Sequence, residues 1–227
     1  MGTDDLFKKR REKRKQREHE YKSPKANSFL IVTEGERTEP LYFKGIQKQI
    51  KDRIGGMVEV VEAPVIDIHG EGSATEKLVE ITQRIVKEAK IIYQNVWLVF
   101  DKDDFEDFDQ AIKDGVDRGY KTAWSNQSFE YWLYLHFYYS DSALHRDDWK
   151  RKLDDIFEQY HLGNGRYQKN YEDIYDIVNS FDGVNTAIKN AKRRMEAFKR
   201  GIDKPSEYNP GTMVYELVEE LMKYLDE

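Results

Sequence analysis

Apolar residues in this chain fall into two patterns, short continuous runs and residues spaced four apart. The runs FLIVT (29–33) and NVWLVFD (95–101) are rich in β-branched and aromatic side chains, which is typical of buried strands. After the first run, Tyr42, Ile46 and Ile50 recur at four-residue intervals and predict a helix with one apolar face. This part of the chain is therefore expected to form a strand followed by an amphipathic helix.

The same two patterns continue along the chain. A loop is predicted for HGEGS at 69–73, and Ser73 and Glu76 match a capping box that opens a helix. A further helix near 107–118 and a short strand near 120–125 follow. Strands that alternate with helices in this way predict an α/β fold, in which helices cover a largely parallel sheet.

Three segments are expected from these patterns. Residues 1–28 are polar and are interpreted as an arm and a linker, and residues 29–127 are expected to form the α/β core. From Ser128 onward the apolar spacing is helical. Residues 128–227 are therefore expected to form a helical C-terminal part that packs on the core.

Acidic residues directly follow both apolar runs. Glu34 follows the first predicted strand, and Asp101, Asp103 and Asp104 follow the second. Asp101 and Asp103 are two residues apart, so their side chains point the same way on an extended segment. Ligands of parallel α/β sheets bind at such strand ends, and Mg²⁺ prefers carboxylate oxygens. The pattern predicts a Mg²⁺ or Mn²⁺ site that activates water and polarises a phosphoryl group.

An Asp-x-Asp pair alone is weak evidence, because carboxylates at strand ends also cap the helices that follow. Together with a glutamate after an earlier strand, it resembles the signature of the Toprim fold, found in topoisomerases, primases and OLD-type nucleases. Asp104 is either a further ligand or a solvated acid. Glu36 and Glu39 are expected to shape their loop or to bind a second ion, and His69 could reach the mouth of the site from its loop.

Two longer stretches, FLIVTEGERTEPLYFKGI (29–46) and VWLVFDKDDF (96–105), contain these acids. They resemble the first and second motifs of the RloB-like family of bacterial defence proteins. SNQSFEYWLYLHF (125–137) resembles a third motif, although it has Gln-Ser where a Pro-Cys-like pair is expected. PSEYNPGTMVYELVEEL (205–221) resembles the C-terminal end of the family.

The resemblance implies a Toprim-type nuclease that cleaves DNA or RNA in antiphage defence beside an ATPase partner. By position, Glu34 would be the Toprim glutamate, acting as metal ligand or general base, and Asp101 and Asp103 would be the Asp-x-Asp pair. In the third motif, Glu130 either assists the metal site or has a structural role. His136 is either a buried, hydrogen-bonded histidine or a catalytic residue.

Charge is unevenly distributed along the chain. The net charge is −6, yet the first 22 residues carry nine Lys or Arg side chains against five acidic ones. This basic arm either adds solubility or contacts phosphate backbones, since clustered cations gain affinity by releasing counterions. The predicted nucleic-acid contacts are Lys8, Lys9, Arg10, Arg11, Lys13, Arg14, Lys15 and Arg17.

Composition excludes several other classes of protein. The chain has no cysteine, which excludes disulfides and thiolate zinc sites. No apolar run approaches the roughly 20 residues needed to cross a bilayer, and the N-terminus does not resemble a secretory signal. We expect a cytoplasmic protein without membrane association, and a homo-oligomer remains open. Two functions compete with the nuclease: a non-catalytic module that docks RNA or a partner protein, and a nucleotidyl transferase.

Overall fold

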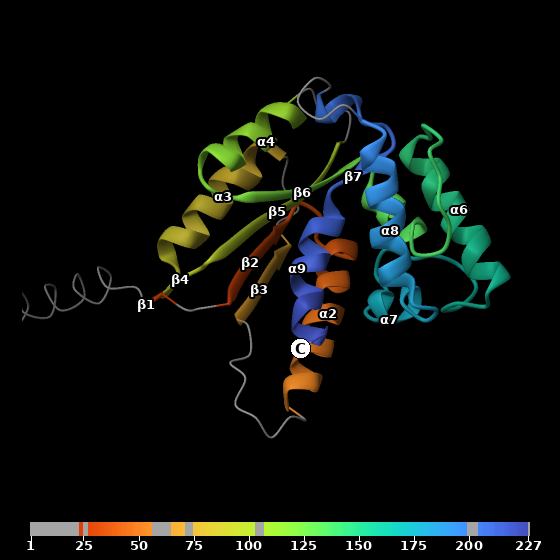
Figure 1. The fold of residues 1–227 in the computed structure, drawn as a ribbon, viewed down its shortest axis with the longest axis horizontal. Coiled ribbons are helices and arrows are strands. Elements are labelled where there is room, and N and C mark those ends of the chain that lie inside the picture. The colour runs from red at the N-terminus through yellow and green to blue at the C-terminus, as the bar shows by residue number, and fades with distance from the viewer. Residues whose placement is uncertain are drawn as a thin grey trace, which may run out of the picture.

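The centre of the structure is a five-stranded sheet in the order β3-β2-β5-β6-β7 (Figure 1). The computed structural model describes residues 23–24, 27–55, 65–70, 75–102, 107–198 and 204–226. The strands β3, β2, β5 and β6 run parallel, and β7 pairs antiparallel with β6. Their bounds are β2 Ser28–Thr33, β3 Val65–Gly70, β5 Asn95–Lys102, β6 Lys121–Asn126 and β7 Gly211–Thr212. The predicted α/β fold is confirmed, and it is consistent with a Toprim-like architecture.

Helices cover both faces of this sheet. Helices α2 and α9 lie on one face, and α3 and α4 lie on the other (Figure 1). Because both faces are covered, strand β2 is buried along its length, as expected for a continuous apolar run in a parallel sheet. A short parallel pair, β1 with β4, forms a separate two-stranded sheet. The bounds are α2 Thr38–Gly55, α3 Thr75–Glu88, α4 Phe108–Asp117, α9 Val214–Asp226, β1 Ser23–Pro24 and β4 Ile91–Ile92.

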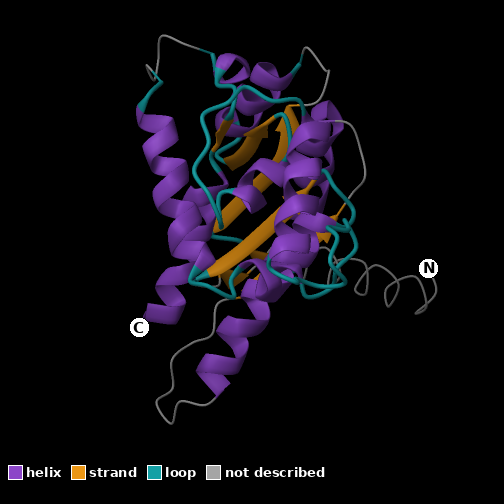
Figure 2. Cartoon of the chain, turned by 90° about the vertical axis from the view of Figure 1, so that its right-hand side faces the viewer, coloured by secondary structure: helices purple, strands orange, loops and turns teal. Residues whose placement is uncertain are grey.

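A group of further helices packs beside α2, and Figure 2 views the molecule from this side. A Cβ added at Gly45 of α2 would overlap Tyr175 of α7, so the absence of a side chain at Gly45 lets these two helices approach. The chain then returns to the sheet as β7 and α9. The bounds are α5 Phe129–Tyr134, α6 Arg146–Gln159, α7 Ile174–Val178, α8 Gly183–Glu196 and the 3-10 turn η1 Pro205–Glu207. Among the helices that the structure describes, none is long and apolar enough to cross a membrane.

Two local predictions differ from the structure, and one strand was not predicted. His69 was expected in a loop, but it lies in β3, because this strand extends along β2 and pairs His69 with Val32. The helix expected after Ser128 ends at Tyr134 and continues as turns. Strand β7 was not predicted, since two residues carry no recognisable strand pattern.

His136 lies in the core rather than in a solvent-accessible site. Its side chain is buried, its Nδ1 lies 3.0 Å from the carbonyl oxygen of Trp132, and its Nε2 lies 3.0 Å from the Tyr42 hydroxyl. A carbonyl oxygen only accepts, so Nδ1 carries the proton and Nε2 accepts from Tyr42. Burial lowers the pKa of His136 to about 4, which keeps the ring neutral. These contacts support the structural interpretation of His136.

This burial predicts a pH-dependent stability. Because the pKa of His136 in the folded state lies below the usual value, its contribution to folding stability is complete above about pH 6.5. This contribution declines as the pH falls toward 4. The stability difference between the wild type and His136→Gln should shrink in that window, by up to about 1.4 kcal/mol per pH unit. Urea unfolding from pH 8 to pH 4 measures this difference. A constant difference across the window would contradict the buried neutral histidine.

Candidate functional site

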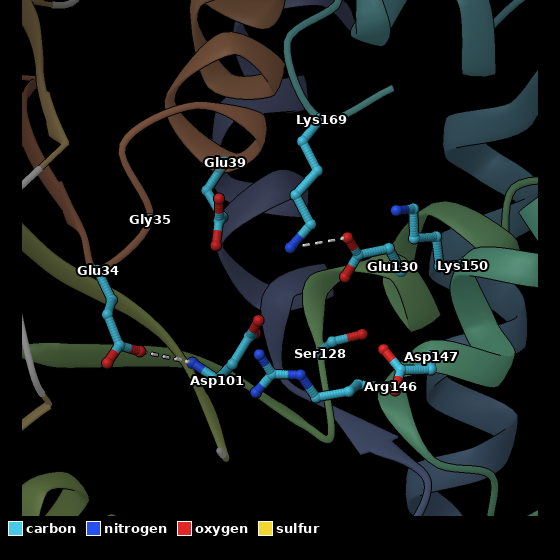
Figure 3. A pocket seen from close by; sticks show the side chains of 10 residues that line it. All are labelled: Glu34, Gly35, Glu39, Asp101, Ser128, Glu130, Arg146, Asp147, Lys150 and Lys169. Atoms are coloured by element: carbon cyan, nitrogen blue, oxygen red, sulfur yellow. Dashed lines mark hydrogen bonds and ion pairs between the residues drawn. The ribbon is translucent and has the colours of Figure 1, made fainter. Parts of the chain in front are cut away.

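A pocket of about 270 Å³ lies where the parallel strands end and the helical part begins. Chain segments far apart in the sequence line it: the β2–α2 loop, the end of β5, the first turns of α5 and α6, and the loop before α7. This is the sheet edge at which the acidic motifs were expected to meet. The lining residues are Glu34, Gly35, Glu39, Asp101, Ser128, Glu130, Arg146, Asp147, Lys150 and Lys169 (Figure 3).

Glu34 and Asp101 lie side by side at this edge. An oxygen of the Glu34 carboxylate accepts a hydrogen bond from the backbone N–H of Asp101 at 3.2 Å. The Asp101 carboxylate instead accepts from the backbone N–H of Phe129 at 3.0 Å, at the start of α5. The structure therefore brings these two predicted residues into one pocket, with the Glu34 carboxylate bracing the end of β5 and the Asp101 carboxylate facing α5.

Glu39 also belongs to the pocket. It stands in the first turn of α2, and Figure 3 shows its carboxylate pointing into the space between Glu34 and Lys169. A Cβ added at Gly35 would overlap that carboxylate, so this position has to be glycine for Glu39 to lie there. Glu39 was expected to shape its loop or to bind a second ion, and its place beside Asp101 was not foreseen.

Glu130 is held at the pocket wall by two contacts. Its side chain is 5% exposed, and its Oε1 accepts a hydrogen bond from the Tyr167 hydroxyl at 3.2 Å. The Lys169 ammonium lies 3.3 Å from the same oxygen, while its side chain remains 62% exposed. The Thr38 hydroxyl donates to the Lys169 carbonyl at 3.0 Å, which ties the loop before α7 to α2. Glu130 thus faces the other acids of the site.

Carboxylates crowd each other in this pocket. Burial raises the pKa of Asp101 well above its usual range, and repulsion from Glu39 and Glu130 raises it further. Burial and repulsion from the same cluster raise the pKa of Glu39 to about 7. Burial alone would lower the pKa of Lys169, but attraction from Glu130, Glu39 and Asp101 raises it above its usual value. A divalent cation would relieve this repulsion more completely than one ammonium does.

The present side-chain positions do not yet form a metal centre. Within the described ranges, no group of three or more His, Asp or Glu side chains is arranged to hold an ion. The Glu34 carboxylate is turned to a backbone amide, and Lys169 lies against Glu130. The donors are nevertheless all oxygens, which is the set that Mg²⁺ and Mn²⁺ prefer. Glu39, Asp101 and Glu130 could hold such an ion if Lys169 moved away.

Several predicted site residues lie outside the described part of the chain. They are Asp103, Asp104 and the eight cations of the basic arm. The sequence analysis missed Ser128, Arg146, Asp147, Lys150 and Lys169 as pocket residues. Ser128 stood within the third motif, but the others lie in polar stretches that resemble any solvated surface.

Comparison with protein-family models gives one clear result. The model described as RloB-like protein matches residues 29–221. Comparisons with curated proteins and with solved structures gave no match. The matched span includes every residue that lines the pocket and most of the chain. The chain therefore belongs to the RloB-like protein family.

Proposed function

We propose that this protein is a Mg²⁺- or Mn²⁺-dependent nuclease that cleaves phosphodiester bonds of DNA or RNA. The observation that carries the proposal is the cluster of Glu39, Asp101 and Glu130 carboxylates in one desolvated pocket. Burying like charges is costly, and such a cluster is typical of sites that bind a cation. Its place at the C-terminal edge of parallel strands is where substrates of α/β enzymes bind.

The residues of the pocket divide into two roles. Asp101, Glu39 and Glu130 would hold the ion, and Asp103 and Asp104 remain candidate ligands. A bound divalent ion supplies positive charge to a phosphoryl oxygen and lowers the pKa of a water molecule. Glu34, which now braces the Asp101 backbone, is the candidate metal ligand or general base at the edge of the cluster.

Lys169 supports this function from the other side of the pocket. Its long, largely exposed side chain can leave Glu130 when an ion takes over the neutralisation of that carboxylate. The ammonium would then be available to the charge of a phosphate group in the same pocket. We also propose, from membership in the RloB-like family, a role in antiphage defence with an ATPase partner.

One observation favours a second candidate function. The Lys169–Glu130 ion pair already provides a cation for the acidic cluster in the structure. The pocket would then be a structural element of a non-catalytic module that docks nucleic acid or a partner protein. The two candidates differ in whether Asp101 is needed for chemistry or only for shape.

Cleavage assays test the main proposal. Labelled single- and double-stranded DNA and RNA should be cut with Mg²⁺ or Mn²⁺ but not with EDTA. Asp101→Asn should lower the rate about 100-fold or more, because it removes a charge on which the ion depends. Asp155→Asn, an exposed acid on α6 outside the pocket, serves as the matched control and should retain activity. Full activity of Asp101→Asn, or no cleavage of any substrate by the wild type, would refute the nuclease.

Proton release provides a test that does not depend on activity. With a pKa of about 7, a large share of the Glu39 side chains carry a proton at pH 6.5, and an ion that binds this carboxylate must displace it. Titration calorimetry with Mg²⁺ should give binding heats that vary with the ionisation enthalpy of the buffer. Glu39→Gln should reduce this dependence. Heats that are the same in all buffers would rule out metal binding at this cluster.

The same raised pKa gives the expected pH dependence without metal. The folded state favours the protonated form of Glu39. The stability that Glu39 contributes is therefore complete below about pH 4.5 and is lost as the pH rises through 7. In EDTA, the wild type should therefore lose stability relative to Glu39→Gln across this window, by up to about 1.4 kcal/mol per pH unit. Thermal melts at pH 5 and pH 8 measure the change. An equal difference in melting temperature between the two proteins at both pH values would show that burial and the neighbouring carboxylates do not raise the pKa of Glu39.

A further inference from the structure

The pocket has a cationic side that the metal chemistry does not use. Four of the five carboxylates come from the β2–α2 loop, α2, β5 and α5, whereas Arg146, Lys150 and the fifth carboxylate, Asp147, come from the first turns of α6. Figure 3 shows the Arg146 side chain extending from α6 toward Asp101, and Lys150 on the far side of the pocket from Glu34. The α6 side therefore has more cations than acids, whereas the other side has more acids than cations.

Packing fixes the position of these cations. Trp149 of α6 is fully buried, and its ring lies 4.8 Å from the ring of Tyr131 and 5.2 Å from that of Tyr134. Arg146 and Lys150 are four residues apart, so they share one face of the helix, and the buried Trp149 lies three residues from Arg146, next to that face. The α5–α6 contact thus turns a cationic helix face toward the pocket.

Ser128 adds an independent observation. Its residue is 5% exposed, and its Oγ has no hydrogen-bond partner among the described residues, although it lines the pocket. A buried hydroxyl without a partner is destabilising, so native proteins seldom keep one that no ligand or water satisfies. Figure 3 shows Ser128 between Asp101 and Asp147, at the boundary of the two sides. Its hydroxyl can donate to an anionic oxygen bound there.

The charge balance determines when an anion can bind. Five carboxylates and three cations line the pocket, so it is net negative when all are ionised. A phosphate would be repelled from the empty site, whereas one divalent ion removes the excess. The cations of α6 are therefore expected to bind phosphate only after a metal ion is present, and by linkage the phosphate should tighten the metal.

We infer that Arg146, Lys150 and Ser128 form a second phosphate subsite, which holds a nucleic-acid phosphate next to the phosphate at the proposed metal ion. The inference rests on the proposed function for the neighbouring phosphate, but its binding can be measured without cleavage. A second phosphate contact beside the reacting phosphate fixes the register of a nucleic-acid strand in the site.

The test is binding of fluorescein-labelled single-stranded DNA and RNA to the full chain, with Ca²⁺ present, followed by anisotropy over a range of salt. Arg146→Gln and Lys150→Gln should each weaken binding about fivefold or more and reduce the salt slope by about 0.7, the value for one lost phosphate contact on a single strand. Arg151→Gln and Lys152→Gln on the same helix are matched controls outside the pocket lining, and their slopes should match the wild type.

Ser128→Ala separates a ligand contact from a structural role. It should weaken binding while leaving the melting temperature unchanged or higher, because it removes an unsatisfied buried hydroxyl. A lower melting temperature with unchanged binding would remove Ser128 from the subsite.

Equal slopes for the α6 pocket variants and their controls would overturn the subsite, even if the wild type cleaves nucleic acid. Binding of inorganic phosphate is measured in parallel with the same variants. If only its binding depends on Arg146 and Lys150, the site takes free phosphate and the inference for nucleic acid is wrong.

Discussion

The repulsion among buried carboxylates at one edge of the sheet is the constraint on which the rest of the site depends. Asp101 ends a central strand, Glu39 begins the helix that follows the neighbouring strand, and Glu130 begins α5. Each element is held by apolar packing, so the backbones that carry these acids cannot move apart without disturbing the core. The fold thus imposes a cost that a cation can relieve. In the described residues Lys169 relieves part of it, while burial, together with repulsion among the carboxylates, keeps the pKa values of Asp101 and Glu39 raised.

The sheet and the helical part both contribute residues to the pocket at this edge. The sheet provides Glu34 and Asp101, whereas α5, α6 and the loop before α7 provide Glu130, the cations and Ser128. The chain then returns to the sheet through β7 and α9. The site therefore exists only when the helical part is packed on the sheet, and loss of that packing would disperse the acids and the cations together.

Much of the architecture could be predicted from local patterns, because apolar runs and helical spacing act over a few residues. The acids at the strand ends were also predictable, since parallel strands bring their carboxyl ends to one edge. Lys169 and Arg146 could not be found in this way. Both residues lie more than 100 positions after Glu34 in the sequence and reach the pocket only through the folding of the chain. Nothing in their local sequence differs from that of a solvated surface. His69 was misplaced for a related reason, because pairing with β2 overrode the turn preference of the glycines around it.

The central claim is that this acidic cluster is a metal site, and the most direct measurement is a crystal structure grown with Mn²⁺ and recorded at a wavelength at which manganese scatters anomalously. The account predicts an anomalous peak in the pocket, bound directly by a carboxylate oxygen of Asp101, with Lys169 displaced from Glu130. A structure at saturating Mn²⁺ that shows no peak in the pocket, with the Lys169–Glu130 pair intact, would contradict it.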